Sequence, residues 1–412
     1  MSTGARVLLY SHDTYGLGHL RRNLAIAGAL LSGLSGLSGC QVLLATGSTV
    51  ADRFRRPSGL QVVKLPPVIK TGVESYDSRE PGIPLSLVRR ARSAVLVDVV
   101  RRWRPDLILV DHSPQGMKGE LLPVFEAVAE LPRAPRLILG LRDILDDPDH
   151  VRSLWGAEGV YETLRSVYDR ILVYGQKDIF DVAEAYGLGE AERAKLSYCG
   201  YVAPPSRPTA LLPEALPQRP FVLGTVGGGG DGVEVLVAAL RAASALGLGA
   251  LLATGPLMST ADRATLEIAL ARNPGAKAVD MVDDIAQVAS GAAFVVTRGG
   301  YNTLSELAAA RVPTVVVPRA WPRMEQLLRA TAFSTRGLVE MVDPVENSDP
   351  DDLHRALIQA VGRLGAGVER PSFNLTGLHA LTLEVREMLG AGSRSRWSGV
   401  ERPAATIATG RP

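Results

Sequence analysis

Two stretches of this 412-residue chain place glycines and ionisable side chains where a helix is predicted to begin. SHDTYGLGHL (11–20) contains His19, and TRGGYNTLSE (297–306) ends in Glu306. Glycine lets a backbone approach a ligand closely, and the free N–H groups of a helix N-terminus attract anions. The same helix end disfavours an imidazolium, so His19 would stay neutral and able to accept a proton. Taken alone, however, a histidine at a helix start is more often a structural cap than a base.

A third stretch, GTVGGGGDG (224–232), leads from a predicted strand into a helix. Four consecutive glycines cost backbone entropy and pack against nothing, so a plain flexible turn explains them poorly. Backbone amides that surround a diphosphate explain them better. Asp231 would repel phosphate, and we expect it to cap the following helix.

Glu306 has two interpretations. Thr303-Leu304-Ser305-Glu306 fits a capping box, in which Glu306 accepts a hydrogen bond from a backbone N–H. The residues alone favour this reading. A carboxylate beyond a strand end could instead accept hydrogen bonds from both hydroxyls of a ribose.

The sequence motifs of several common enzyme classes are absent. The first glycine loop reads G-x-G-x-x-R, and Gly47-Ser48, rather than an acidic residue, follows the second strand, which argues against a nicotinamide cofactor. The phosphate loop, H-E-x-x-H and G-x-S-x-G are absent. Asp111, His112 and Ser113 are adjacent, whereas a hydrolase triad is assembled from separated residues. His112 and Arg142 end neighbouring strands, so we expect them to line one pocket and contact the substrate there.

Composition narrows the setting. The 45 basic and 43 acidic residues nearly balance, which provides no argument for nucleic acid as a partner. Two cysteines, Cys40 and Cys199, cannot form a disulfide framework or a four-thiolate metal site, and favour the reducing cytoplasm. No signal peptide or membrane-spanning segment is predicted. The acidic run at 146–149 is typical of a solvated turn, so no metal is expected.

Continuous apolar runs of strand length alternate with helical patterns along the chain, as in parallel sheets that are covered on both faces. The predicted strands cover 6–10, 41–45, 61–65, 106–110, 136–140, 170–174, 195–201, 221–226, 249–254, 276–280, 293–297 and 314–317. This pattern predicts two doubly wound, Rossmann-like α/β domains that face a cleft. Ligands should bind at the carboxyl ends of the strands.

The predicted boundaries follow composition. An N-terminal Rossmann-like domain (1–202) precedes a Pro-rich linker (203–220), and a C-terminal Rossmann-like domain (221–372) precedes a last helix (373–390). The tail at 391–412 is polar and rich in Gly, Ser and Pro, so we expect it to be disordered.

Residues 280–326 (DMVDDIAQVASGAAFVVTRGGYNTLSELAAARVPTVVVPRAWPRMEQ) resemble the donor-binding region of the peptidoglycan N-acetylglucosaminyltransferase family. This is glycosyltransferase family 28, which has the two-domain GT-B fold. The shared pattern is a paired Asp-Asp, Arg-x-Gly, Thr-x-x-Glu, a Val-Pro strand and a late Glu/Gln pair.

The resemblance implies that domain 1–202 binds the acceptor and domain 221–372 binds the nucleotide sugar. It also implies a role for each matching residue. His19 and Gly18 would lie near the acceptor, with His19 as the catalytic base, and Glu306 would hold the ribose. The other donor-binding residues would be Met281, Val282 and Ile285 around uracil; Arg298, Gly300, Thr303, Gly228, Gly229, Gly230 and Gly232 near the diphosphate; and Gln326 on the sugar. This chain departs from the family at Glu325, where glutamine is frequent, and at Gly230-Asp231, which replace Ser-Gln.

The implied reaction transfers a sugar, with inversion, from a UDP-hexose or UDP-N-acetylhexosamine to an acceptor hydroxyl. It needs no metal or cofactor, and the acceptor is a small molecule, a glycan or a lipid-linked glycan. One alternative is a UDP-sugar 2-epimerase, although epimerases follow the glycines with Gln-Glu-Glu where this chain has Tyr301-Asn302-Thr303. Another is a non-catalytic subunit that binds a nucleotide sugar or an acceptor.

A helix predicted at 86–104 carries six arginines and one aspartate. A solvated basic face is the plainer interpretation. The alternative is a docking surface for anionic lipid, which would make the protein peripheral at the inner face of the membrane.

Overall fold

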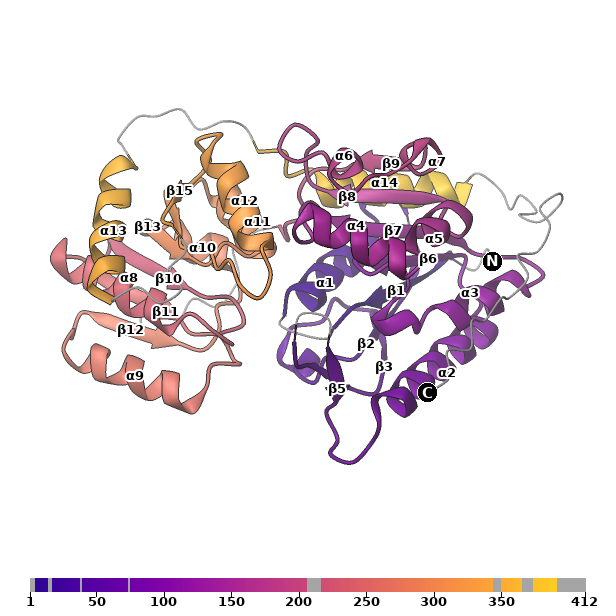
Figure 1. Cartoon of the computed structure of the whole chain (residues 1–412), viewed down its shortest axis with the longest axis horizontal. Helices are drawn as coiled ribbons and strands as arrows, with labels where there is room; N and C mark the ends of the chain where they lie inside the picture. The colour runs from indigo at the N-terminus through magenta and orange to yellow at the C-terminus, as the bar shows by residue number, and fades with distance from the viewer. Residues whose placement is uncertain are drawn as a thin grey trace.

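A computed structural model describes residues 4–13, 17–37, 39–72, 75–205, 216–343, 350–364 and 373–390. It has two α/β halves side by side, one formed by the first half of the chain and the other by residues after 216 (Figure 1). The two Rossmann-like domains predicted from the sequence are confirmed. The middle of the predicted linker (206–215) and the predicted disordered tail (391–412) lie outside the described residues.

The N-terminal half contains a seven-stranded parallel sheet in the order β3-β2-β1-β6-β7-β8-β9. The five inner strands, β2, β1, β6, β7 and β8, are almost fully buried because helices cover both faces, which explains their continuous apolar runs, whereas the edge strands β3 and β9 are partly exposed. The strands are β1 (Arg6–Ser11), β2 (Gln41–Thr46), β3 (Gln61–Lys64), β6 (Leu107–Asp111), β7 (Arg136–Arg142), β8 (Arg170–Tyr174) and β9 (Leu196–Tyr198).

The helices of this half are α1 (Gly18–Leu31), α2 (Leu85–Trp103), α3 (Leu122–Ala129), α4 (Pro148–Ala157), α5 (Val160–Ser166), α6 (Val182–Ala185) and α7 (Glu190–Arg193). Short 3₁₀ turns lie at η1 (Leu34–Gly36), η2 (Ala51–Arg53) and η3 (Met117–Gly119). A small antiparallel hairpin of β4 (Val68–Lys70) and β5 (Tyr76–Ser78), which the sequence did not predict, precedes α2.

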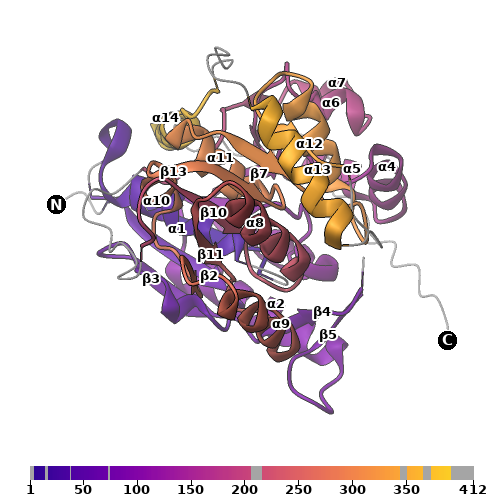
Figure 2. The same cartoon turned by 90° about the vertical axis from the view of Figure 1, so that its left-hand side faces the viewer.

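The C-terminal half contains a six-stranded parallel sheet in the order β12-β11-β10-β13-β14-β15. Helices α8 and α13 pack together on one face of it (Figure 2). Its elements are β10 (Phe221–Thr225), α8 (Val233–Ala245), β11 (Gly249–Ala253), α9 (Thr260–Ala271), β12 (Ala276–Val279), α10 (Ile285–Ala289), β13 (Ala292–Thr297), α11 (Tyr301–Ala310), β14 (Thr314–Val316), α12 (Glu325–Ser334), β15 (Glu340–Met341) and α13 (Pro350–Arg363).

The last helix, α14 (Gly377–Gly390), returns to the N-terminal half and packs against α1 and η1 (Figure 1). Its apolar side chains Leu378, Leu381 and Val385 are buried there. Helix α14 therefore completes the N-terminal domain, although it follows the C-terminal half in the sequence.

Direct contacts join the two halves. A buried ion pair connects Arg329 of α12 to Asp143, which follows β7, with 2.9 Å between the closest nitrogen and oxygen. The amide of Val202 donates to the hydroxyl of Tyr301 at 2.9 Å. The amide of Met324 donates to the carboxylate of Asp146 at 2.8 Å. These contacts fix the position of the C-terminal half relative to the N-terminal half.

Helix α2 is less basic on its surface than its sequence indicated. Arg92 is fully buried and forms an ion pair with Glu120, while Arg102 pairs with Asp98 on the same helix. Within the described part of the chain, no helix has the length and apolar character needed to cross a bilayer.

Candidate active site

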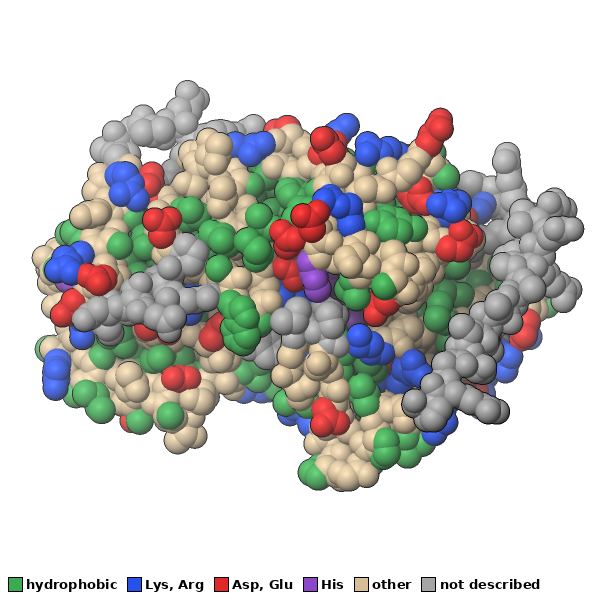
Figure 3. Space-filling model, viewed as in Figure 1, with side chains coloured by type: hydrophobic (Ala, Val, Ile, Leu, Met, Phe, Trp, Pro, Cys, Tyr) green, Lys and Arg blue, Asp and Glu red, His purple; other side chains and the backbone are tan. Residues whose placement is uncertain are grey.

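A cleft of about 400 Å³ lies between the two halves, at the carboxyl ends of their strands. A space-filling view shows the hollow where the two lobes meet, with a histidine and acidic side chains at its edge (Figure 3). The cleft is lined by most of the predicted site residues, namely Gly18, His19, Arg142, Gly228, Gly229, Gly230, Met281, Val282, Ile285, Arg298, Gly300, Thr303, Glu306 and Gln326. Gly232 and His112 do not line it.

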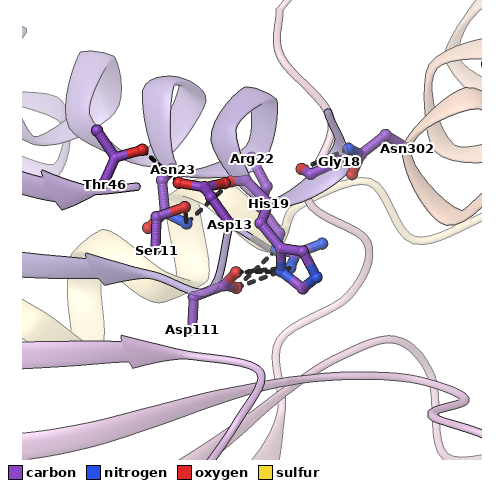
Figure 4. A network of polar contacts seen from close by, with 9 residues as sticks. All are labelled: Ser11, Asp13, Gly18, His19, Arg22, Asn23, Thr46, Asp111 and Asn302. Atoms are coloured by element: carbon purple, nitrogen blue, oxygen red, sulfur yellow. Dashed lines mark hydrogen bonds and ion pairs between the residues drawn. The ribbon is translucent and has the colours of Figure 1, made fainter. Parts of the chain in front are cut away.

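His19 stands in the first turn of α1 and contacts Asp111 at the end of β6 (Figure 4). The His19 Nδ1 and Asp111 Oδ2 atoms are 2.6 Å apart. An ionised carboxylate can only accept, so Nδ1 carries the proton in this contact and Nε2 is left as a free acceptor. Arg22 Nη2 lies 3.0 Å from the same Nδ1, but its donors already reach both oxygens of Asp111 at 2.8 and 2.9 Å.

The environment keeps His19 neutral. Burial is the largest effect and lowers the pKa of His19 to about 4, although Asp111 opposes the change. Burial would raise the pKa of Asp111, but the Arg22 guanidinium and His19 outweigh it and hold this pKa at about 2. The arrangement is a neutral imidazole oriented by an ionised carboxylate, which is the form that can take a proton from a hydroxyl.

The glycine stretch after β10 forms the opposite wall. Gly229 has φ +83°, and a Cβ atom there would come within 2.1 Å of the carbonyl oxygen of Thr254. Only glycine fits this close approach of two backbones. Gly232 has φ +101° and is the N-cap residue of α8, where no side chain caps the helix. The prediction that Asp231 caps α8 was wrong, because its carboxylate pairs with Arg319 at 2.9 Å.

Helix α11 presents its N-terminus to the cleft. Gly299 has φ +82°, and the N-cap residue Gly300 lacks a side-chain cap. The capping-box interpretation of Glu306 was therefore wrong: α11 begins at Tyr301, so Thr303 already lies inside the helix. The Oε2 atom of Glu306 accepts from Arg21 of α1 at 2.8 Å, and its Oε1 atom is buried without a hydrogen-bond partner among the described residues.

The burial of Glu306 has an electrostatic consequence. Its side chain is 3% exposed, and burial raises its pKa, although Arg21 opposes the shift. A second contact between α1 and α11 lies close by, where the side-chain amide of Asn302 donates to the carbonyl of Gly18 at 2.7 Å (Figure 4). The helix that carries His19 and the helix that carries Glu306 thus meet across the cleft.

Glu325 and Gln326 lie at the start of α12. Burial disfavours the charge of Glu325, but Arg142 and Arg319 outweigh this effect and lower its pKa. Gln326 accepts from the amide of Arg319 at 3.4 Å. Arg298, by contrast, is engaged by the carboxylate of Glu234 on α8. At this end of the cleft, Arg298 and Arg319 are therefore both paired with carboxylates.

Four residues of this site were missed by the sequence analysis: Arg21, Arg22, Asp111 and Asn302. Asp111 was considered only as part of a hydrolase triad. The position of Asp111 at the end of a buried strand could have marked it as a site residue. Its pairing with His19 could not be predicted, because it depends on β6 lying beside β1 in the sheet. In the described ranges, no three His, Cys, Asp or Glu side chains could hold a metal ion together.

Comparisons with known proteins identify the family. Residues 226–362 match the profile of the glycosyltransferase family 28 C-terminal domain. The chain is 34% identical over 342 residues to the UDP-N-acetylglucosamine–N-acetylmuramyl-(pentapeptide) pyrophosphoryl-undecaprenol N-acetylglucosamine transferase of Paenarthrobacter aurescens, an alignment covering 69% of this chain and 90% of the relative. The chain belongs to glycosyltransferase family 28. It is a glycosyltransferase.

Solved structures agree with the GT-B fold of this family 28 glycosyltransferase. The kitacinnamycin glycotransferase matches with a TM-score of 0.58 at 16% identity, covering 96% of this chain and 97% of that one. MurG of Acinetobacter baumannii matches with a TM-score of 0.54 at 14% identity, covering 94% and 98%. A UDP-glucose:anthocyanidin 3-O-glucosyltransferase in complex with UDP matches with a TM-score of 0.56 at 12% identity, covering 95% of each chain.

Proposed function

We propose that this glycosyltransferase moves a hexose or N-acetylhexosamine from a UDP-sugar to an acceptor hydroxyl, with inversion and without a metal ion. One observation carries the proposal: the oriented, neutral imidazole of His19 faces the N-terminus of α11 and the glycine loop after β10 across one cleft. A proton acceptor and an anion-binding wall thus stand on opposite sides of the space where a sugar would lie.

The C-terminal wall holds the donor in this proposal. The backbone amides at the start of α11 and in Gly228–Gly230 bind the diphosphate and stabilise its growing charge as it leaves. Glu306 accepts hydrogen bonds from the ribose, for which its unpartnered Oε1 is available. Met281, Val282 and Ile285 surround the uracil, and Gln326 binds hydroxyls of the sugar.

The N-terminal wall activates the acceptor. His19 Nε2 takes the proton of the acceptor hydroxyl while its oxygen bonds to the anomeric carbon. The bond from that carbon to the diphosphate oxygen breaks at the same time, and its electron pair leaves with the diphosphate. Asp111 stabilises the imidazolium that forms, because its carboxylate accepts the Nδ1 proton at 2.6 Å. Attack opposite to the leaving group inverts the anomeric configuration.

The relatives support the choice of donor. The Paenarthrobacter enzyme is named for UDP-N-acetylglucosamine and a pyrophosphoryl-undecaprenol acceptor, and the anthocyanidin enzyme was solved with UDP. By this analogy the acceptor is a small molecule, a glycan or a lipid-linked glycan. For a lipid-linked acceptor, the arginines of α2 that remain exposed, such as Arg89, Arg90 and Arg101, would face an anionic membrane surface.

The test is release of UDP from UDP-glucose and UDP-N-acetylglucosamine in EDTA, first with water as the acceptor. We expect slow UDP release that chelation leaves unchanged, and calorimetric binding of UDP in preference to GDP. His19→Gln should lower the rate by about 10²–10⁴-fold, the usual contribution of a general base. His379→Gln, on the exposed side of α14, is the control and should match the parent.

Three outcomes would contradict the proposal. Loss of UDP release in EDTA that magnesium restores would require a metal. Conversion of the UDP-sugar into its 2-epimer would indicate an epimerase. Preferred binding of GDP would move the specificity away from uracil.

A further inference from the structure

The first turn of α1 is held from the C-terminal half at two points. Asn302 of α11 donates its side-chain amide to the carbonyl of Gly18 at 2.7 Å (Figure 4). Arg21 donates to the Oε2 atom of Glu306, on the same helix, at 2.8 Å. Gly18 directly precedes His19, and Arg21 follows it by two positions. These two bracketing contacts, Asn302–Gly18 and Arg21–Glu306, therefore lie on either side of the proposed base.

The turn that carries His19 has no cap of its own. Leu17 is the N-cap residue of α1, its side chain caps nothing, and the first turn contains no acidic residue. The first N–H groups of such a helix have no partner within the helix. Inside the N-terminal half, Arg22 and Asn23 tie the turn to the ends of β6 and β1. The two bracketing contacts tie it to α11.

The contact between Asn302 and Gly18 is close and has a defined direction. A Cβ atom at position 18 would come within 3.3 Å of the Nδ2 atom of Asn302, so glycine lets the two helices approach. A carbonyl oxygen only accepts, so the NH₂ group of Asn302 must face Gly18. The Oδ1 atom of Asn302 is buried without a hydrogen-bond partner among the described residues. An apolar side chain would leave no such atom, so packing alone does not account for asparagine here.

The contact between Arg21 and Glu306 contributes geometry more than stability. The side chain of Glu306 is 3% exposed and that of Arg21 is 27% exposed, and a pair of this kind adds little to the free energy of unfolding. The halves are already joined elsewhere by Arg329 and Asp143. An ionised carboxylate has about four lone-pair sites, so Arg21 and two ribose hydroxyls can bind Glu306 together. A bound ribose would then be linked through Glu306 and Arg21 to the turn of the base.

The orientation of the His19 ring and its distance from the donor have separate origins. Asp111, in the N-terminal half, fixes the tautomer and direction of the ring through Nδ1 at 2.6 Å. It does not fix how far the turn stands from the donor wall, to which α11 belongs. Reacting atoms must approach to about 3–3.5 Å, and a misplacement of about 1 Å lowers a rate about a hundredfold. The bracketing contacts bear directly on this distance.

We propose that Asn302 and Arg21 are positioning residues, which set the distance between His19 and the donor by tying the first turn of α1 to α11. Both act through His19 rather than on the reacting atoms. The inference rests on the proposed function, because it needs His19 to be the base and α11 to hold the donor. Helix α11 then has two tasks, since it binds the donor and supports the base.

The test compares kcat, KM and the Kd for UDP, with UDP release from UDP-glucose and UDP-N-acetylglucosamine as the reaction. Asn302→Leu removes the amide donor at similar volume. It should lower kcat about ten- to a hundredfold, the cost of a misplaced group, while KM and the Kd for UDP stay at the parent values. The pH profile should keep its shape, because Asp111 still orients the ring. A merely structural role would lower the melting midpoint and leave kcat unchanged.

Arg21→Met removes the second bracketing contact and keeps the apolar stem, so kcat should fall here too. Arg21→Lys keeps a charge that can reach Glu306 and should recover part of the rate. Arg336→Met is the matched control. Arg336, just after α12, donates to the carbonyl of Asp178 in the N-terminal half, and neither residue lines the cleft. It loses the same charge and a contact between the halves, and should keep the parent kcat.

Hydrogen exchange on the full chain provides a measurement that needs no turnover. The amides of residues 21–24 should exchange faster in Asn302→Leu than in the parent, because the turn opens more often once α11 releases it. Arg336→Met should leave their exchange unchanged. Parent-like kcat in both Asn302→Leu and Arg21→Met, parent-like exchange in Asn302→Leu, or an equal fall of kcat in Arg336→Met would overturn the inference.

His19→Gln keeps the two proposals apart. A parent-like rate in His19→Gln, or no UDP release by the parent, would refute the proposed function, while hydrogen exchange would still show whether α11 holds the turn. A slow His19→Gln protein beside parent-like Asn302→Leu and Arg21→Met proteins would refute only the positioning role.

Discussion

Glu306→Gln separates donor binding from the contact between the two halves. The carboxylate of Glu306 meets Arg21 at 2.8 Å, with side chains 3% and 27% exposed respectively, and its second oxygen is unpartnered. Glutamine has nearly the same shape but replaces one acceptor oxygen by an NH₂ donor. The substitution therefore acts on the charge and on the hydrogen bonds, with little change in packing.

The two roles of Glu306 differ in magnitude. Partly exposed ion pairs contribute about 0–1 kcal/mol, so the loss of the Arg21 contact should change the free energy of unfolding only slightly. Hydrogen bonds to a charged group contribute about 1.5–3 kcal/mol. If Glu306 holds the ribose, the Kd of the Glu306→Gln protein for UDP should be about ten- to a hundredfold higher than that of the parent, since about 1.4 kcal/mol corresponds to a factor of ten.

The assay is UDP titration by calorimetry together with the melting midpoint of the same samples. Glu384→Gln is the control, because Glu384 of α14 pairs with Arg170 at 2.9 Å on the N-terminal half, outside the cleft. It should lose a comparable ion pair and keep the parent Kd. A Glu306→Gln protein with unchanged UDP affinity and a lowered midpoint would refute the reasoning, and would assign Glu306 to contact between the halves.

Further predictions concern pH, orientation of the base and the interface. Because burial lowers the pKa of His19 to about 4, we expect kcat/KM to fall on the acid side near pH 4 rather than near 6.5; an acid limb near 6.5 would contradict the buried, neutral ring. The same shift makes the unfolded chain bind more protons, so stability should be lost as the pH falls from about 6.5 towards 4 in urea titrations. Asp111→Asn should lower kcat about a hundredfold or more while UDP binding persists, and a parent-like kcat would exclude Asp111 as the orienting group. Arg329→Met should cost about 3–5 kcal/mol in urea unfolding, because it leaves Asp143 buried and unpaired; a cost under about 1 kcal/mol would show that Asp143 finds another partner.

The local sequence pattern was enough to predict the two-domain α/β architecture. Buried parallel strands need apolar side chains on both faces, so the runs at 6–10, 136–140 and 293–297 identified strands within one or two residues of their ends. Glycine positions were equally informative, because Gly229 and Gly299 adopt positive φ where no other residue fits easily. The resemblance of 280–326 to family 28 located the donor wall, since its motif lies within one continuous stretch.

Only the tertiary structure showed which residues are the hydrogen-bond and ion-pair partners of the site residues. Glu306 could be assigned to a capping box from its spacing, but its actual partner, Arg21, is 285 positions away. The pairing of His19 with Asp111 required β6 to lie next to β1, and strand order is set by how the helices pack rather than by any local signal. The return of α14 to the N-terminal half has the same origin. Spacing along a helix or strand determines which residues share a face, whereas the neighbour across the cleft depends on the packing of the whole chain.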